Sequence, residues 1–370
     1  MSDLATLTSK YGMKVGKPGI RSVGAITFGP EGVLFVADNR EAKVFAIGVD
    51  DAAAPGSSPV ALDRLATRLA SYLGCGRDDV AIRGMAVHPV SRAAYLSVMR
   101  GLGDAAQPVL VRVASSGSIG DLALQNVAFS EVAIKDAPAA TDSRKEGHLV
   151  GKNEGEELTL PNGHVLRVAW DSLRIVTVTD LKYLNGMLIV AGASNEEFSS
   201  TLRRIPFPFT DGYSTNSLEI FHVSHGKYET HSPIRSFVPY GGGAGILASY
   251  TCTPVVHFSL SDLTSDGQVR GRTVAELGTM NTPLDMVAFE RDGEEYVLVA
   301  NSSHGLFKIA IRDVQAQDAL TEQGELLGVP RTHLPQEGVR RMAVAGDSVL
   351  MIQADSEGDF HLRAYDCATI

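Results

Sequence analysis

Short runs of alternating apolar and polar residues recur along the whole chain, and they predict its architecture. Six segments each combine a short strand of small residues, a turn rich in Gly, Pro, Asn or Asp, and a more apolar second strand. These segments are residues 23–39, 82–100, 178–194, 234–250, 283–302 and 339–356. Each is followed by a loop and a third strand, at 43–47, 108–113, 200–205, 254–260, 305–311 and 360–365. The chain is therefore built from six copies of one unit.

A fourth alternating run follows the unit in four copies. These runs are 129–134, 218–223, 273–277 and 325–329. Four antiparallel strands in each repeat of about 50 to 60 residues are typical of a propeller blade. We predict an all-β fold, a six-bladed β-propeller forming one domain over residues 1–370. The blade cores are predicted near 20–60, 80–134, 175–223, 232–278, 283–330 and 338–366. Because the sixth copy ends without a fourth strand, we expect residues 4–15 to supply it and close the ring.

Two segments interrupt this period. Residues 61–74, ALDRLATRLASYLG, have apolar positions at helical spacing and end at Gly74, so they predict an amphipathic helix. Residues 135–168 are polar and contain several Gly and Pro, and we expect a long inserted loop or hairpin arm there. The helix lies between the first and second copies, and the arm lies between the second and third.

Composition and charge narrow the function classes. The net charge of −10 disfavours a general nucleic-acid or anionic-membrane surface, which needs clustered Lys and Arg. No window approaches the roughly 18 apolar residues of a membrane span. Only three cysteines occur, widely separated and without a CxxC pair, which excludes a disulfide framework. We expect a soluble protein, cytoplasmic by default, and periplasmic or secreted if a signal peptide has been removed.

Polar residues gather on one predicted face of the propeller. The links from second to third strands and from one blade to the next share this face with the beginnings of the first strands. At those beginnings, three aligned positions carry arginine, and a fourth carries aspartate: Arg83, Arg235, Arg340 and Asp285. Converging guanidinium groups would bind a carboxylate or phosphate, so a small anionic ligand is one hypothesis. The alternative is that Asp285 and nearby acids neutralise these arginines and tie the blades together. Asn39, Asn195 and Asn301 lie on loops of the same face.

Three histidines lie within ten residues of one another near the middle of the chain. They are His222, His225 and His231, and His304 lies on a loop of the same predicted face. Imidazole binds zinc, copper and iron, so this cluster predicts a divalent metal site, which Cys252, Glu229 or Glu197 could complete. The alternative is a set of separate surface or packing histidines.

The repeats resemble a group of six-bladed propellers that includes the gluconolactonase, strictosidine-synthase-like and NHL-repeat types. Residues 28–39, FGPEGVLFVADN, are similar to blades of those families. The gluconolactonase resemblance implies a divalent metal in the channel, held by acidic residues and Asn or Asp. The matching positions here offer Asp285 and Asp180, but Gly24 and the three arginines stand where oxygen ligands are needed. No catalytic residue is carried over.

Two functions remain open. The first is a ligand- or metal-binding protein, extending to a metal-dependent enzyme that acts on a small anionic molecule. In it, Arg83, Arg235 and Arg340 bind the substrate, while His225, His231 or His304 supplies a metal ligand or a base. The second is a non-catalytic scaffold that presents the same face to a protein partner.

Overall fold

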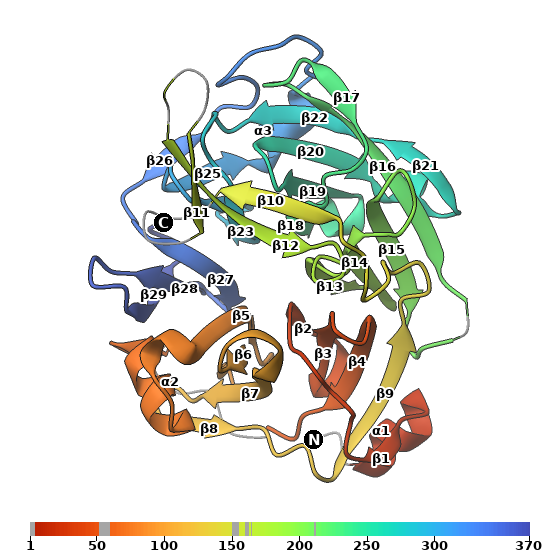
Figure 1. Cartoon of the computed structure of the whole chain (residues 1–370), viewed down its shortest axis with the longest axis vertical. Coiled ribbons are helices and arrows are strands. Elements are labelled where there is room, and N and C mark those ends of the chain that lie inside the picture. Colours follow the sequence, from red (N-terminus) through yellow and green to blue (C-terminus); the bar gives the residue numbers. More distant parts are fainter. Residues whose placement is uncertain (1–3, 52–59, 150–154, 160–162, 164, 211) are drawn as a thin grey trace.

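The computed structural model describes residues 4–51, 60–149, 155–159, 163, 165–210 and 212–370. Antiparallel sheets stand radially around a central channel and form a β-propeller (Figure 1). Three helices occur in the described residues: α1 (Leu4–Tyr11), α2 (Leu65–Leu73) and α3 (Ile311–Ala316). Short 3-10 turns cover Pro30–Gly32, Arg77–Asp79, Gly103–Ala105, Gly241–Gly243 and Leu260–Leu263.

The first two sheets come from the N-terminal third of the chain. The first has the order β1-β9-β4-β3-β2 and the second the order β5-β6-β7-β8. The strands of the first are β1 (Lys14–Gly16), β2 (Ile26–Phe28), β3 (Val33–Asp38), β4 (Lys43–Gly48) and β9 (Val127–Ala133). Those of the second are β5 (Val80–Val87), β6 (Ala94–Arg100), β7 (Gln107–Val113) and β8 (Ile119–Asp121).

The remaining radial sheets follow one another along the chain. The third contains β13 (Asp180–Leu184), β14 (Met187–Ala193), β15 (Ser200–Pro206), β16 (Ser214–His222) and β17 (Lys227–Glu229). The fourth contains β18 (Ile234–Tyr240), β19 (Gly245–Tyr250), β20 (Pro254–Ser259) and β22 (Arg272–Glu276). The fifth contains β23 (Pro283–Arg291), β24 (Glu294–Asn301), β25 (Leu306–Ala310) and β26 (Thr332–Leu334), and the last contains β27 (Val339–Ala345), β28 (Ser348–Ala354) and β29 (Phe360–Asp366). Strand β21 (Gly267–Arg270) crosses over and pairs in parallel with β16.

Local sequence explains the tight hairpins between inner strands. Asn185-Gly186 joins β13 to β14, and Asp292-Gly293 joins β23 to β24. All four residues have positive φ. Two-residue turns with positive φ at both positions match the twist of the flanking strands, and Asn-Gly and Asp-Gly adopt them most readily.

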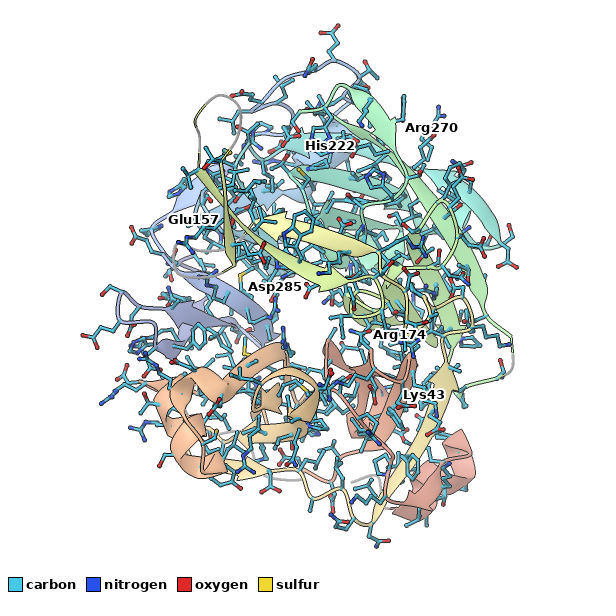
Figure 2. The ribbon with its side chains drawn as sticks, viewed as in Figure 1. Lys43, Glu157, Arg174, His222, Arg270 and Asp285 are labelled. Carbon is cyan, nitrogen blue, oxygen red and sulfur yellow. The ribbon has the colours of Figure 1, made fainter. Side chains whose placement is uncertain are left out.

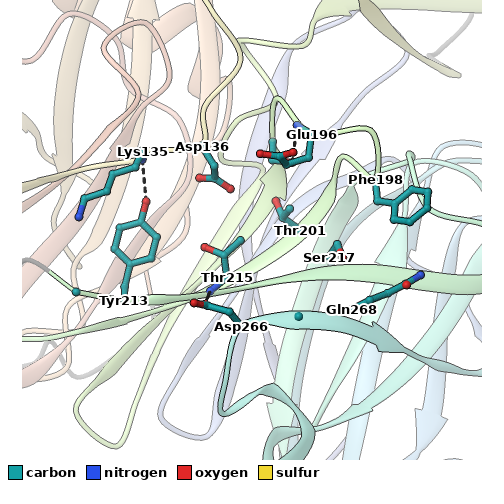
Figure 3. Close-up of a pocket in the computed structure, with 13 residues that line it drawn as sticks. Lys135, Asp136, Glu196, Phe198, Thr201, Tyr213, Thr215, Ser217, Asp266 and Gln268 are labelled. Atoms are coloured by element: carbon teal, nitrogen blue, oxygen red, sulfur yellow. Dashed lines mark hydrogen bonds between the residues drawn. The ribbon is translucent and has the colours of Figure 1, made fainter.

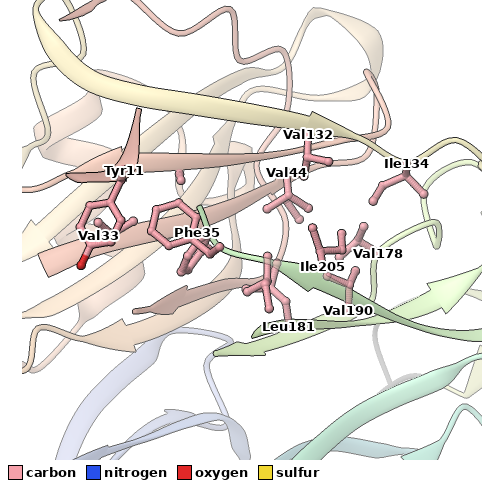
Figure 4. Packing of buried hydrophobic residues seen from close by; sticks show 14 of the residues in the cluster. Tyr11, Val33, Phe35, Val44, Val132, Ile134, Val178, Leu181, Val190 and Ile205 are labelled. Carbon is pink, nitrogen blue, oxygen red and sulfur yellow. The ribbon is translucent and has the colours of Figure 1, made fainter. Parts of the chain in front are cut away.

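The order of the sheets around the ring differs from their order in the chain. The innermost strands contact one another in the cycle β2, β5, β27, β23, β18, β13 and back to β2. The first sheet therefore lies between the second and the third, and the second lies beside the last. A buried apolar cluster joins the first sheet directly to the third, with Phe35 and Val44 packing against Leu181 and Ile205 (Figure 4).

Strand β9 accounts for this order, and it corrects the predicted second blade at 80–134. Its residues were expected to be the fourth strand of that blade. Instead, the chain completes β5 to β8 and returns to pair β9 with β4, where Phe45 is the partner of Glu131. The alternation of apolar residues predicts a strand correctly but does not specify which sheet edge it joins.

The predicted ring closure by residues 4–15 is also wrong. Residues 4–11 form α1, because Leu4, Leu7 and Tyr11 recur at helical spacing. Strand β1 then pairs with β9 in the first sheet. At the last sheet, Leu62 forms a two-hydrogen-bond bridge with Leu362 of β29, and α2 packs beside it.

Two other boundaries are resolved by the structure. The helix expected at 61–74 is present as α2. The fifth sheet extends beyond the predicted limit of 330, because its fourth strand is β26 rather than 325–329.

The segment expected to be an inserted arm forms a small sheet of its own, here called the arm. It contains β10 (Lys145–Leu149), β12 (Val165–Ser172) and β11 (Glu156–Thr159), in that order. In Figure 1 the arm is drawn over the part of the ring that contains β13, β18 and β23. The Leu149 amide donates a hydrogen bond to Thr282 Oγ1 at 3.1 Å, just before β23. The arm is thus attached to the rim of the channel.

Candidate functional site

The inner strands and the arm enclose a cavity of about 940 Å³ in the central channel. Every radial sheet contributes to its wall, and the arm contributes His148 and Asp171. The inner-strand residues that line it include Gly24, Arg83, Asp180, Lys182, Arg235, Ser236, Leu284, Asp285 and Arg341. Figure 2 shows Asp285 beside the opening in the middle of the ring.

Three arginines give this cavity its charge. Arg341 Nη1 donates a hydrogen bond to the Leu284 carbonyl oxygen at 2.9 Å. Arg83 and Arg235 make no hydrogen bond or ion pair with any residue that the structure describes. Burial, together with the positive charges of Arg341 and Arg83, lowers the pKa of Arg235 to about 10, against the opposing charges of Asp171 and Asp285. Burial also lowers the pKa of Arg83. The cavity thus faces two cations, half-buried Arg235 and exposed Arg83, that make no hydrogen bond or ion pair with the described residues.

Bulges at the beginnings of the inner strands decide which side chains reach the cavity. The register shifts once in β5, β18, β23 and β27, and the residues skipped in the pairing are Arg83, Arg235, Leu284 and Arg340. A bulge re-aims the side chains next to it. In β27, Arg341 lines the cavity, whereas the predicted Arg340 does not. The bulges also align Leu284, and not Asp285, with the arginines of the other sheets.

Asp285 and Asp180 tie neighbouring sheets together. Asp285 accepts hydrogen bonds from the backbone amides of Met286 at 2.9 Å and Met342, in the next sheet, at 2.7 Å. Asp180 accepts from the Phe237 amide, in the next sheet, at 3.0 Å, and from Lys182 Nζ at 2.8 Å. Burial raises the pKa of Asp285, against the opposing charges of Arg341 and Lys182. Asp285 lines the cavity as well as making these contacts between sheets.

The arm places a histidine and a carboxylate over the arginines. His148 Nδ1 lies 3.6 Å from Asp171 Oδ2. Burial lowers the pKa of His148, and the charge of Arg235 lowers it further. Asp171 also acts on the arginines, since its charge opposes the lowering of the pKa of both Arg83 and Arg235. These two side chains were not among the predicted site residues.

The three predicted asparagines have different surroundings. Asn39 is buried and exchanges two hydrogen bonds with the Val178 backbone, at 2.9 and 3.0 Å, which joins the first sheet to the third. Asn301 is buried in a turn, where its Nδ2 donates to Val299 and Gly305. Asn195 is exposed and does not line the channel cavity. Asn39 lines the cavity, but its side-chain amide is already engaged.

The histidine segment forms a second cluster, away from the channel. His222, His225 and Cys252 present ligand atoms that all lie within 4.8 Å of one another. The buried carboxylate of Glu229 joins the two imidazoles, with Oε2 2.7 Å from His222 Nδ1 and Oε1 2.8 Å from His225 Nδ1. Figure 2 shows His222 well away from Asp285 and the central opening.

Contacts between Glu229 and the histidines shift the pKa values of this cluster. Burial alone would lower the pKa of His222, but hydrogen bonds with Cys252 and Glu229 outweigh it and raise the pKa to about 9. Burial alone would raise the pKa of Glu229, but the two histidines outweigh it and lower the pKa to about 2. The cluster therefore combines two buried polar side chains, His222 and Glu229, with the exposed His225.

The other two predicted metal ligands lie outside this cluster. His231 is exposed, and its backbone oxygen accepts a hydrogen bond from Ser199 Oγ. His304 Nε2 lies 3.1 Å from the Thr279 carbonyl oxygen. The structure thus brings together His222 and His225 but neither His231 nor His304.

A further cavity of about 460 Å³ lies at the third sheet and β21. Figure 3 shows the carboxylates of Asp136, Glu196 and Asp266 around it. Asp136 is already held by the fully buried Arg203, at 2.9 Å from Nε, and Asp266 accepts from the Thr215 amide. We therefore regard the channel as the stronger candidate.

Comparisons with known proteins assign no family to this chain. No family model matches it, and no curated protein matches it. Solved structures give weak similarity only. A streptogramin B lyase is 9% identical with a TM-score of 0.38, over 95% of this chain and 97% of that chain. The PQQ-bound aldose sugar dehydrogenase of Streptomyces coelicolor is 14% identical with a TM-score of 0.35, over 95% and 96%. The Swd1 β-propeller domain of Myceliophteria thermophila is 13% identical with a TM-score of 0.36, over 93% and 83%. Such values carry no functional argument.

No helix among the described residues has the length and hydropathy needed to cross a lipid bilayer.

Proposed function

We propose that the chain is a single six-bladed β-propeller that binds a small anionic molecule in its central channel, beneath the arm. The ligand carries a carboxylate or a phosphate. The observation that supports this most strongly is the state of Arg83 and Arg235, which line one cavity without a hydrogen bond or ion pair to any described residue. Arg235 is half-buried and Arg83 lies at an exposed position of the cavity wall. Two guanidiniums facing one cavity repel each other unless an anion lies between them, so they favour an anionic partner.

The geometry of arginine suits this ligand class. A guanidinium group presents paired N–H donors that match the two oxygens of a carboxylate or phosphate. Arg341 also lines the cavity and adds a third positive charge, which lowers the pKa of both Arg83 and Arg235. The volume of about 940 Å³ suits a small molecule, within the usual range of ligand pockets.

The metal that the gluconolactonase resemblance implies does not fit this channel. Asp180 and Asp285 stand at the matching positions, but both accept backbone hydrogen bonds from a neighbouring sheet. The surrounding arginines would also repel a cation. A divalent metal such as zinc, copper or iron is proposed only for the separate histidine cluster.

The metal-dependent enzyme considered from the sequence is not supported as a single site. It needs His225, His231 or His304 next to the arginines, and none of the three lines the described cavity. His148, from the arm, is the histidine that does line it.

A second candidate function is the presentation of a face to a protein partner. The observation favouring it is on the arm, where Leu158, Val165 and the single tryptophan, Trp170, are exposed by 45%, 57% and 50%. Exposed apolar groups of this kind occur at protein interfaces. A Trp170→Ser variant that retains every interaction of the wild type with its cellular partners would contradict this second candidate.

Ligand-dependent thermal unfolding tests anion binding. Wild type would be heated with inorganic phosphate, sulfate, citrate or a sugar phosphate, beside an Arg83→Met/Arg235→Met variant. We expect at least one anion to raise the midpoint of wild type and not of the variant. The control Arg312→Gln removes an exposed arginine of α3 and should respond as wild type does. Equal responses of wild type and double variant to all four anions would contradict the proposal.

A further inference from the structure

We propose that His222, His225 and Cys252 bind one zinc ion, with Glu229 as the carboxylate that orients both imidazoles. The inference does not rest on the anion proposed for the channel. It begins with the ligand types: two imidazole nitrogens and one thiolate are a set that zinc prefers over the hard cations calcium and magnesium. Three protein ligands leave a fourth position for water or a further ligand.

Glu229 supplies the feature that distinguishes this cluster from an accidental meeting of side chains. It is 7% exposed, and each of its oxygens faces the Nδ1 atom of one histidine. Zinc-binding histidines commonly donate one ring N–H to a carboxylate, which fixes the ring and directs the other nitrogen to the metal. Here one carboxylate would do this for two histidines, leaving both Nε2 atoms for the ion.

The spacing of the ligand atoms agrees with this assignment after a small adjustment. Bonds of about 2.0 to 2.3 Å to a tetrahedral zinc place ligand atoms about 3.3 to 3.8 Å apart. One ring nitrogen of each histidine and Cys252 Sγ lie within 4.8 Å of one another. A movement of about 1 Å by exposed His225 or half-buried Cys252 would therefore bring the set to bonding distance. His222 Nε2 lies 3.0 Å from Ser224 Oγ, a contact that the metal would replace.

The fold holds the two ligand-bearing segments in place. The turn between β16 and β17 carries His225, and the link between β19 and β20 carries Cys252. Gln323 Nε2 donates to the Ser224 carbonyl oxygen at 3.0 Å, and the Gly324 amide donates to Val223 at 3.2 Å. The turn is therefore anchored on the loop that precedes β26.

A second buried carboxylate supports a cation at this place. Glu276 is fully buried, which raises its pKa, while the charge of His222 opposes that rise. Its Oε2 accepts from the Ser224 amide at 3.3 Å, while its Oε1 has no hydrogen-bond partner among the described residues. Two buried acids, Glu229 and Glu276, surround a cluster that would gain a divalent charge.

The test measures zinc binding by the full-length, reduced protein. After removal of metals with a chelator, zinc would be added and its stoichiometry determined by titration calorimetry and elemental analysis. Cobalt(II) would serve as a spectroscopic probe, because a thiolate ligand gives a sulfur-to-cobalt charge-transfer band in the near ultraviolet. We expect one zinc per chain in wild type and a charge-transfer band that is absent from Cys252→Ser.

Matched variants separate this site from nonspecific histidine and cysteine binding. His225→Ala changes an exposed residue and should abolish tight zinc binding, whereas His231→Ala and Cys75→Ser should retain it. Glu229→Gln should weaken zinc binding by roughly 10- to 100-fold, as for other carboxylates that orient metal-binding histidines. Circular dichroism would confirm that each variant is folded. Wild type without tight zinc, or equal affinity in His225→Ala and His231→Ala, would overturn the proposal.

Discussion

Arg83 and Arg235 line the same cavity from inner strands on opposite sides of the ring, and the charge of Arg83 contributes to the lowered pKa of Arg235. Two like charges that line one cavity repel each other. The fold tolerates this cost, and the proposed anion would offset it. Four consequences of the structure can be measured.

Replacing Arg235 with methionine should increase the stability of the ligand-free protein. The variant keeps most of the side-chain volume but removes a half-buried charge that makes no hydrogen bond or ion pair with the described residues. We expect the free energy of unfolding to rise by about 1 to 3 kcal/mol in a buffer without phosphate or carboxylate, measured by urea denaturation. Arg203→Met is the contrasting control. Arg203 is fully buried and paired with Asp136, so its loss should cost about 3 to 5 kcal/mol. A destabilised Arg235→Met would show that Arg235 already has a partner.

Attachment of the arm should depend on pH through Glu146. Burial, with the negative charges of Glu229 and Asp171, raises the pKa of Glu146 to about 7, although Ser232 donates a hydrogen bond to it. The ordinary value is 4.5. Since the folded pKa of this acid is the higher one, the attached arm is favoured fully below pH 4.5. This contribution is lost as the pH rises from about 4.5 to about 7, at a cost of at most about 3 kcal/mol.

Hydrogen exchange of the β10 and β12 amides would measure this effect. Exchange corrected for intrinsic rates should be faster at pH 8 than at pH 5 in wild type, and Glu146→Gln should remove most of the difference. Glu157→Gln, on the exposed side of the arm, should keep it. An unchanged pH dependence in Glu146→Gln would contradict the assignment.

Loss of the Asp285 carboxylate should weaken the ring between the fifth and last sheets. In Asp285→Ala the backbone amide of Met342 loses its carboxylate acceptor, whereas the amide of Met286 keeps Ser236 Oγ at 3.1 Å. Because an unsatisfied buried group costs about 1 to 3 kcal/mol, we expect a loss of about 1 to 3 kcal/mol in urea denaturation. Asp292→Asn, at the exposed turn after the same strand, removes a carboxylate but tolerates the positive φ of that position, and it should change little. A near-neutral Asp285→Ala would mean that these hydrogen bonds do not hold the sheets together.

The unusual order of the first two sheets can be tested by carbodiimide crosslinking. Lys43 Nζ lies 3.0 Å from Glu131 Oε1, across the pairing of β4 with β9. A crosslinked peptide joining these residues should be found by mass spectrometry. Lys10 of α1 forms an ion pair with Glu31, and this pair provides a second crosslinking site as a control. If Lys10–Glu31 is crosslinked and Lys43–Glu131 is not, the placement of β9 is wrong.

The sequence predicts strands well but leaves their partners open. Period-two alternation identified β9, yet the same residues could pair at the edge of either sheet. The need for a closing strand in the last blade predicts a strand over residues 4–15, although Leu4, Leu7 and Tyr11 have helical spacing. Only tertiary packing, with Leu7 buried in the first core cluster, settles that choice.

The sequence also predicts only part of the candidate site, because it does not reveal bulges or contacts between distant segments. Arg83 and Arg235 were named from their place in the repeat, and both line the cavity. Arg341 was missed because Val339-Arg340-Arg341 contains a bulge that a regular alternation does not reveal. His148 and Asp171 lie in the arm, outside the repeat, so no aligned position pointed to them. In the histidine segment, Cys252 was considered only as an added ligand, because it is distant in sequence.

The most direct test of the central proposal is to locate an anion in the channel. Crystals would be soaked in selenate, and anomalous diffraction would be recorded at the selenium edge for wild type and for Arg83→Met/Arg235→Met. We predict a selenium peak within hydrogen-bonding distance of the Arg83 and Arg235 guanidiniums in wild type and none there in the variant. A wild-type channel without anomalous density, while selenate occupies surface sites in the same crystal, would contradict it.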